Sequence, residues 1–246
     1  MKRNMITAFC ALFALCGCVH AMEVPETMQN AVSDETEETN AVQPEQSVPV
    51  ELQSDIWNDD NVMKALMAVS LAYDNYHPDK LAEYSTSVAL IKVCSIDGTS
   101  SYFEPRDMHG SIYTYGRFET IEVYKDGELE PGQEYTFTRF GGIGTWEDYA
   151  AGRDESSLEK RLNAMKEAGK AIPEYVYEDA IDDIFIESGK TYLAFFEPSE
   201  MSAIIGGYPI CGLQGGLREV DLERRLVLNN FTGVWENLDE VIAILA

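Results

Sequence analysis

The spacing of hydrophobic residues changes from helical to strand-like near residue 87. Before that point, residues 61–71 carry apolar side chains at near-helical spacing, which predicts a helix capped by Asp59 or Asp60. After it, β-branched and alternating residues predict short strands bounded by turns such as Asp97-Gly98. We expect strands at 87–96, 111–124, 133–140, 191–196, 202–205, 216–220 and 225–228, and further helices at 78–84, 156–168, 173–183 and after Asn237.

Several local signals refine these predictions. Gly116, inside the second predicted strand, indicates a bulge or a sharp coil. Lys125-Asp126-Gly127 is typical of a turn between the second and third strands. Ser156 with Glu159, and Asn237 with Glu240, have the spacing of capping boxes, in which each residue's side chain bonds a free amide of the other.

The amino-terminal segment has the zones of an export signal. Lys2 and Arg3 precede an apolar run that ends at Leu15 and is too short to cross a hydrocarbon layer as a helix. The sequence Leu15-Cys16-Gly17-Cys18 resembles the lipobox of bacterial lipoproteins, although Cys16 departs from the usual Ala or Ser. The resemblance implies a lipid on Cys18, cleavage before it, and attachment to the outside of a bacterial cell membrane. The alternative is an ordinary secretory signal cut after Ala21.

Composition separates a tether from one domain. Residues 22–53 contain many Glu, three Pro, no Lys or Arg and no aromatic residue. Such a segment has too little apolar surface to offset the entropy of ordering. We therefore expect a signal peptide at 1–17, a disordered acidic tether at 18–55 and a single globular domain at 56–246.

The five cysteines reduce to one pair in the exported chain. Cys10 and Cys16 leave with the signal, and Cys18 carries the lipid. Cys94 and Cys211 remain, in a compartment that permits disulfides. Two interpretations stay open: a bridge that closes a long loop, or two separate buried thiols.

Four segments together resemble a known small barrel. They read DKLAEYSTSVALIKVCSI, TYGRFETIEVYKDGELEPGQEYTFTRFGG, SGKTYLAFFEP and YPICGLQGG, and they span about residues 80–228. Their order is similar to OB-like barrels of exported bacterial proteins, related in shape to netrin and TIMP-type domains. The resemblance implies an α+β, mainly β fold: an OB-like barrel of about five to six strands with flanking helices and a helical insertion between the third and fourth strands. It implies no catalytic residue.

Charge and motifs exclude several function classes. The formal net charge of −25 opposes binding to nucleic-acid phosphates. The chain lacks an HExxH zinc motif, a GxSxG nucleophile motif and a complete phosphate-binding loop. No catalytic residue, cofactor or metal ligand is therefore predicted. Glu178, Asp179, Asp182 and Asp183 would share one and a half turns of the expected helix, where they form either a Ca²⁺ ligand set or a solvated acidic face.

Aromatic residues are the remaining candidates for recognition. An OB-like barrel often binds glycans or peptides by stacking on its strands. The candidate face consists of Tyr113, Tyr115, Phe118, Trp146 and Tyr149, and the alternative is core packing. We expect a lipid-anchored extracytoplasmic binding or interaction module for an envelope protein or glycan. The alternatives are an envelope hydrolase that uses acidic residues, and a Ca²⁺-stabilised structural domain.

Overall fold

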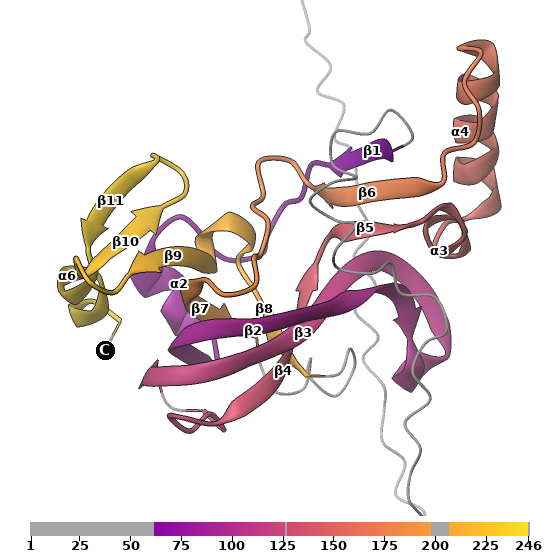
Figure 1. The fold of residues 1–246 in the computed structure, drawn as a ribbon. Coiled ribbons are helices and arrows are strands. Elements are labelled where there is room, and N and C mark those ends of the chain that lie inside the picture. Colours follow the sequence, from indigo (N-terminus) through magenta and orange to yellow (C-terminus); the bar gives the residue numbers. More distant parts are fainter. Residues whose placement is uncertain (1–61, 126, 198–206, 246) are drawn as a thin grey trace, which may run out of the picture. The chain divides into compact units, whose positions relative to one another are not determined.

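Two β-sheets account for most of the regular structure (Figure 1). The computed structural model describes residues 62–125, 127–197 and 207–245, which all belong to the unit formed by residues 43–246. Strands outnumber helices in this part of the chain, so the prediction of a mainly β, α+β fold is confirmed. The expected signal peptide, lipidated Cys18, tether, strand at 202–205 and Asp126 turn residue lie outside the described residues.

The larger sheet contains eight strands. Their order in the sheet is β11-β10-β9-β7-β2-β3-β4-β8. The strands are β2 (Ser87–Phe103), β3 (Met108–Lys125), β4 (Glu134–Phe140), β7 (Thr191–Phe196), β8 (Tyr208–Ile210), β9 (Leu217–Asp221), β10 (Leu226–Asn229) and β11 (Val234–Asn237). The described predicted strands are all present, but β2 and β3 are longer than expected, and β8 and β11 were not predicted. The strand β2 runs through Asp97-Gly98 because its register shifts there instead of ending.

The sheet is larger than the predicted barrel of five to six strands. The short strand β8 pairs in parallel with β4, and its register with β7 is limited to the pair Phe196 and Ile210. The same side of β7 also pairs with β9 over residues 192–194, and β10 and β11 continue outward from there. The sheet therefore extends to eight strands because β7 accepts β9 beside its short contact with β8.

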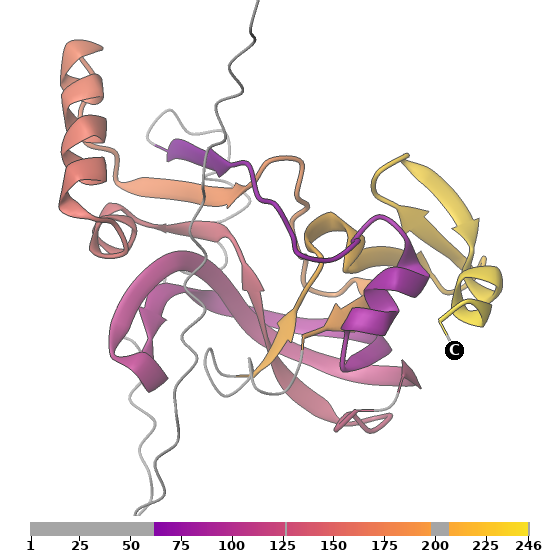
Figure 2. The ribbon, with the colours of Figure 1, turned by 180° about the vertical axis from the view of Figure 1, so that it is seen from behind.

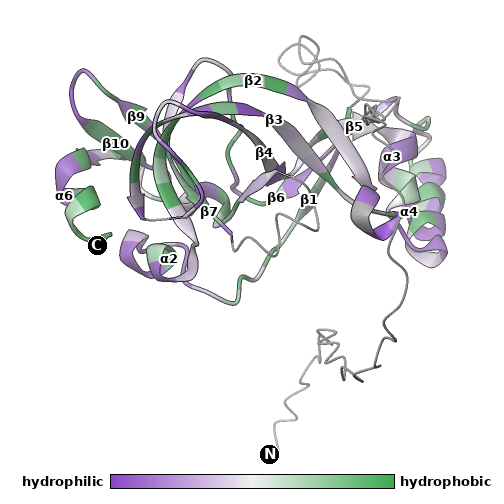
Figure 3. Ribbon diagram, turned by 90° about the horizontal axis from the view of Figure 1, so that it is seen from below, coloured by the Kyte–Doolittle hydropathy of each residue, from purple (hydrophilic) through white to green (hydrophobic). Residues whose placement is uncertain are grey.

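The large sheet has an apolar layer on each face. One layer contains Phe118, Phe137 and Phe196, which are completely buried. The other is covered by the helices α2 (Pro78–Tyr84) and α6 (Leu238–Ala243), both of which were predicted. Figure 2 shows these two helices close to β7 and β9, and in Figure 3 hydrophobic residues gather along β2, β9 and β10.

The absence of a side chain at Gly116 permits a close approach between the paired strands β2 and β3. A Cβ atom on Gly116 would lie 2.2 Å from the carbonyl oxygen of Ser95 on the facing strand. The pairing register opposite Gly116 shifts between Ile96 and Gly98. The predicted irregularity at Gly116 is therefore present as a close backbone approach that a side chain would prevent.

The smaller sheet replaces two predicted helices. It contains β1 (Val62–Met67), β6 (Tyr175–Ala180) and β5 (Gly142–Thr145), in the order β1-β6-β5. The helices predicted at 61–71 and 173–183 are wrong, because these two segments pair with each other as parallel strands. Each is too short and too ambiguous in its apolar spacing to reveal a partner that lies far away in the sequence.

The connection from β4 to β7 is the expected insertion, but it is not purely helical. It contains α3 (Trp146–Ala151) and α4 (Glu155–Glu167) together with β5 and β6. The cap of α4 is Asp154 and not Ser156, whereas Asn237 caps α6 as predicted, accepting from the Glu240 amide at 3.1 Å. Two short 3₁₀ turns also occur among the described residues, at Glu104–Arg106 and Leu213–Gly215. None of the helices in the described ranges has the length and apolar character needed to cross a membrane.

Candidate functional site

A groove of about 1070 Å³ runs between β1 and α4. The strand β1 contributes Lys64, α4 contributes Lys160 and Arg161, and the segment before β6 contributes Lys170. The described residues that line the groove include no Asp or Glu. Its apolar lining consists of Val62, Met63, Ala164, Met165, Ala168, Ala171, Ile172 and Pro173.

The charge of this groove is opposite to that of the chain. The sequence has 18 Lys and Arg against 43 Asp and Glu. A random patch on such a protein would be acidic, yet the described lining of this groove carries Lys160, Arg161 and Lys170 and no Asp or Glu. The described lining therefore presents cationic groups to a negatively charged ligand.

Arg161 is held in position by contacts across the groove. Its Nη1 atom lies 3.3 Å from the sulfur of Met63 on β1. Its guanidinium carbon lies 5.4 Å from the centre of the Tyr149 ring, within the range of a cation–π contact. Because α4 buries none of its residues completely, these contacts matter for holding the helix near β1.

A buried ion pair fixes the base of α4. The carboxylate of Glu178, on β6, is completely buried and is paired with Arg153, which lies between α3 and α4. The same carboxylate accepts a 3.1 Å hydrogen bond from the backbone amide of Ile112 on β3. Arg153 also lies 4.5 Å from the centre of the Tyr149 ring. The junction of the two helices is thereby connected to both sheets.

The first turn of α4 has its own polar cap. The Asp154 carboxylate accepts hydrogen bonds from the Ser157 amide at 2.9 Å and from the Ser156 hydroxyl at 2.7 Å. Hydrogen bonds from Ser157 have the largest effect and the bond from Ser156 the next largest, and together they hold the pKa of Asp154 below its usual range. The cap stabilises the helix that carries Lys160 and Arg161. In Figures 1 and 2, α3 and α4 lie at the same end of the small sheet.

The predicted acidic cluster does not share a helical face. Glu178 and Asp179 are adjacent on strand β6, so their side chains point to opposite sides of it. Asp182 lies in the following turn with φ of 64°. No group of three or more His, Cys, Asp or Glu side chains suited to a metal ion occurs within the described ranges. The helical geometry assumed for a Ca²⁺ ligand set is therefore wrong.

The predicted aromatic face separates into different environments. Tyr113 stacks on Phe103 with ring centres 5.1 Å apart, and the ring centre of Tyr115 lies 6.3 Å from that of Tyr113. Phe118 points to the opposite side of β3 and is completely buried beside Phe196. Phe118 belongs to the core because the side chains of a strand alternate between its faces.

The other two aromatic residues lie on α3. The ring centres of Trp146 and Tyr149 are 5.8 Å apart. Tyr149 is buried, and Trp146 packs against the same small apolar cluster. These residues support the wall of the cationic groove instead of extending the surface near Tyr113.

The two cysteines of the domain are free thiols. Cys94 is exposed on β2, whereas Cys211 is buried next to Ser85, with Sγ and Oγ 3.5 Å apart. Burial raises the pKa of the Cys211 thiol to about 12. The bridge considered from the sequence is absent, and only one of the two thiols is buried.

The groove was not recognised in the sequence. A signal was nevertheless available, because residues 160–170 contain four Lys or Arg and one Glu in an otherwise acidic chain. Lys64 lies far away in the sequence and joins them only through the pairing of β1 with β6.

No protein-family model matches this chain, and neither does any curated protein or solved structure. Its function therefore has to be inferred from the chemistry of its own residues.

Proposed function

We propose that this chain is a lipid-anchored extracytoplasmic interaction module whose groove binds an acidic, partly apolar segment of another envelope protein. The observation that carries the proposal is the groove between β1 and α4. Its described lining includes Lys160, Arg161 and Lys170 and no Asp or Glu, in a chain with a net charge of −25. Complementary charge of this kind steers a partner and fixes its orientation.

The apolar lining favours a polypeptide over a glycan. Ile172 is 60% exposed, and Met63 and Met165 line the same groove. A polyanionic sugar offers carboxylates or phosphates but few groups that would bury these side chains. A peptide can offer both acidic and apolar side chains, and methionine adapts to different partner shapes.

The proposed location follows from the amino-terminal sequence. Leu15-Cys16-Gly17-Cys18 supports lipidation of Cys18. Each buried methylene contributes about 0.8 kcal/mol to membrane binding, so two or three acyl chains anchor a protein firmly. Residues 22–53 would separate the domain from the membrane as an acidic tether.

We further propose that part of the large sheet is an OB-like barrel that serves as a scaffold. Successive pairings lead from β7 to β2, β3, β4 and β8, and from β8 back to β7. The apolar cluster around Phe118 and Phe137 would form its interior. The insertion between β4 and β7 then carries most of the groove, as binding elements often occupy loops on a rigid scaffold.

Peptide binding tests the proposed function. The probe is a fluorescent peptide in which Glu alternates with Leu, titrated with the full chain and read by anisotropy. We expect saturable binding that weakens as salt is raised, and weaker binding to polyglutamate of equal charge. Lys160→Glu should weaken binding roughly tenfold, the equivalent of about 1.4 kcal/mol.

A matched control lies on the same helix. Lys166 is on α4 but does not line the groove, so Lys166→Glu should leave the affinity nearly unchanged. Equal losses in both variants would show nonspecific charge attraction and overturn the proposal. A synthetic peptide of residues 22–53 is tested in parallel. Tighter binding of that peptide, lost in Lys160→Glu, would mean that the chain occupies its own groove and would overturn the role of a partner.

The anchor is tested separately by fractionation of cells. The wild-type protein should partition with the membrane, and Cys18→Ser should release it into the soluble fraction. Globomycin, which blocks cleavage of lipoprotein signals, should cause the precursor to accumulate. A Cys18→Ser protein that stays with the membrane would disprove the anchor without affecting the peptide-binding result.

A further inference from the structure

The helix α4 differs from the other α-helices of the described residues in how it packs. α2, α3 and α6 each bury at least one side chain, whereas α4 buries none. Helices in proteins are stabilised mostly by packing one face against another element. On the groove side of α4, Ala164 and Ala168 are exposed, so this face is available for a further element to pack on.

The groove residues of α4 lie on one face of the helix. They recur at steps of three or four residues, which return to the same side of a helix. The face consists of Ser157, Lys160, Arg161, Ala164, Met165 and Ala168. It is about 16 Å long, since an α-helix rises about 1.5 Å per residue. A partner that covers it has to run along α4 for about three turns.

The cations lie on either side of an apolar centre. Lys160 and Arg161 are in the amino-terminal half of α4, and Lys170 follows its carboxyl end. Gly169 ends the helix with φ of 67°, and the Lys170 amide donates to the Met165 carbonyl oxygen at 2.9 Å. This helix ending holds Lys170 beside the last turn. Between the two positive ends the face carries Ala164, Met165 and Ala168.

The opposite wall of the groove is largely apolar. Val62 and Met63 come from β1, and Ala171, Ile172 and Pro173 from the segment before β6. Ile172 is 60% exposed, so a partner that covers it removes apolar surface from water. The partner therefore needs apolar side chains along its middle and carboxylates near its ends.

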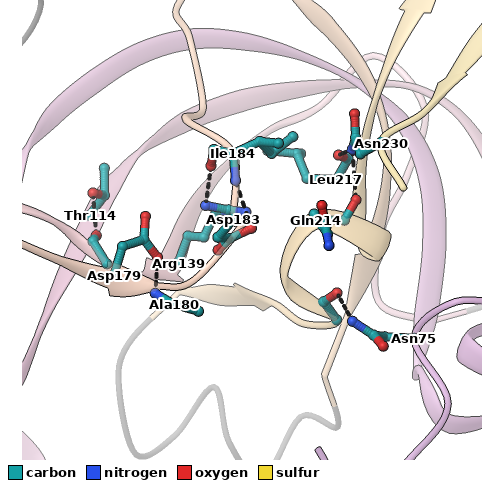
Figure 4. Close-up of polar contacts among 12 residues, drawn as sticks. Asn75, Thr114, Arg139, Asp179, Ala180, Asp183, Ile184, Gln214, Leu217 and Asn230 are labelled. Carbon is teal, nitrogen blue, oxygen red and sulfur yellow. Dashed lines mark hydrogen bonds and ion pairs between the residues drawn. The ribbon is translucent and has the colours of Figure 1, made fainter. Parts of the chain in front are cut away.

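A buried ion pair elsewhere in the fold shows why the groove cations can recruit a partner. Arg139 is paired with Asp183 and donates to the Ile184 carbonyl oxygen at 2.7 Å, as Figure 4 shows. Both charged side chains are buried, so another molecule does not reach them. Lys160 and Lys170 are exposed and can meet the carboxylates of another molecule.

A helix suits this surface better than an added strand. A strand would need unpaired backbone groups to bond with, but those in the body of α4 are bonded within the helix. Helices instead pack through their side chains, with axes about 8–10 Å apart, and small residues at the contact permit the shorter distances. Ala164 and Ala168 are such residues.

We propose that the partner segment binds as an acidic amphipathic helix packed along α4. This inference rests on the proposed function and adds the conformation of the partner. Apolar residues that recur every third or fourth position of the partner would pack between Ala164 and Ile172. Carboxylates near its two ends would pair with Lys160 and with Lys170.

Two fluorescent peptides of equal length and composition test this conformation. In the helical-period peptide, Leu recurs every third or fourth residue among Glu, and in the alternating peptide Leu and Glu alternate. Titrated with the full chain and read by anisotropy, the helical-period peptide should bind roughly tenfold more tightly. Difference circular dichroism should show a gain of helix on binding. A central Pro should weaken its binding roughly tenfold, because proline breaks a helix.

Two substitutions on α4 locate the bound helix. Ala164→Gln adds a longer side chain to the groove face and should weaken binding of the helical-period peptide roughly tenfold. Asn163→Gln places the same side chain at a neighbouring exposed position that does not line the groove, so the affinity should stay nearly unchanged. Both positions are exposed, and circular dichroism of each variant alone checks that it folds.

The outcomes separate this inference from the proposed function. If the alternating peptide binds at least as tightly as the helical-period peptide, or if no helix is gained on binding, the helical partner is overturned and the proposed function stands. If neither peptide binds, both are overturned. Equal effects of Ala164→Gln and Asn163→Gln would place the peptide away from the groove face and would overturn docking along α4.

Discussion

The guanidinium of Arg139 lies 2.6 Å from the Asp183 carboxylate, and the two side chains are 4% and 0% exposed. Arg117 and Glu134 form a similar pair, at 3.1 Å, but about half of each of their side chains is exposed. The two pairs have the same chemistry in different dielectric surroundings. Water screens the second pair much more than the first.

Removing the acid from the buried pair should strongly destabilise the fold. Asp183→Ala leaves the buried Arg139 charge without its partner, and we expect a loss of about 3–5 kcal/mol in the free energy of unfolding. Glu134→Ala, at the exposed pair, should cost less than about 1 kcal/mol. Urea unfolding of both variants measures the difference. Similar losses for the two variants would contradict the burial of the Arg139 pair.

Asp179 should make stability depend on pH. Burial, followed by the nearby charge of Asp183, raises the pKa of Asp179 to about 7, whereas an unfolded Asp titrates near about 3.9. Between these values the folded state binds a proton that the unfolded state does not bind. The contribution of Asp179 to stability is therefore present below about pH 4 and is lost as the pH rises to about 7.

The Asp179→Asn variant tests this pH dependence. The amide cannot titrate, so the free energy of unfolding of the variant should rise relative to the wild type between about pH 4 and 7. Urea unfolding at several pH values provides the measurement, with Asp97→Asn at a partly exposed position as the control. A constant difference between Asp179→Asn and the wild type would show that Asp179 is ionised throughout.

Gly141 should tolerate alanine less well than Gly132. Both have a left-handed backbone, with φ of 88° and 77°, so alanine costs about 1–2 kcal/mol of strain at either position. A Cβ atom on Gly141 would also lie 2.4 Å from Asp179 Oδ1, whereas one on Gly132 meets no atom within 4 Å. Gly141→Ala should therefore lose about 1–3 kcal/mol more than Gly132→Ala in chemical denaturation. Equal losses would mean that the Asp179 side chain moves away freely.

The two thiols should differ in reactivity. Cys94 is exposed, while Cys211 is buried and its pKa is raised to about 12. A thiol reagent added to native protein should modify Cys94 quickly and Cys211 only after unfolding. Cys94→Ser should remove the fast reaction, and Cys211→Ser should leave it unchanged. A native protein in which neither thiol reacts until a reductant is added would indicate a bridge between them.

Local sequence patterns predicted the central strands well. Residues 133–140 and 191–196 alternate or run apolar over lengths typical of strands, and the structure has β4 and β7 there. The cap at Asn237 was also recognisable, because a helix start depends on residues that are close in sequence. These elements require no knowledge of a distant partner.

The same patterns failed where a partner decided the outcome. The segments that contain β1 and β6 have apolar residues at spacings compatible with a helix, yet they pair with each other along six residues each. That pairing also places Lys64 near α4. It directs Glu178 and Asp179 to opposite faces of β6, where Glu178 accepts from the Ile112 amide and Asp179 accepts from the Tyr177 hydroxyl. The groove and the buried charges could therefore not be read from residue types alone.

By itself the sequence determined the acidic composition of residues 22–53, the mainly β character and most strands of the large sheet, because each of these depends on composition or on neighbouring residues. The tertiary structure alone decided which charges are buried, which cations meet and which aromatic residues reach the surface. The physical reason is that desolvation and pairing of a charge depend on the groups folded around it, and here those groups come from distant parts of the chain.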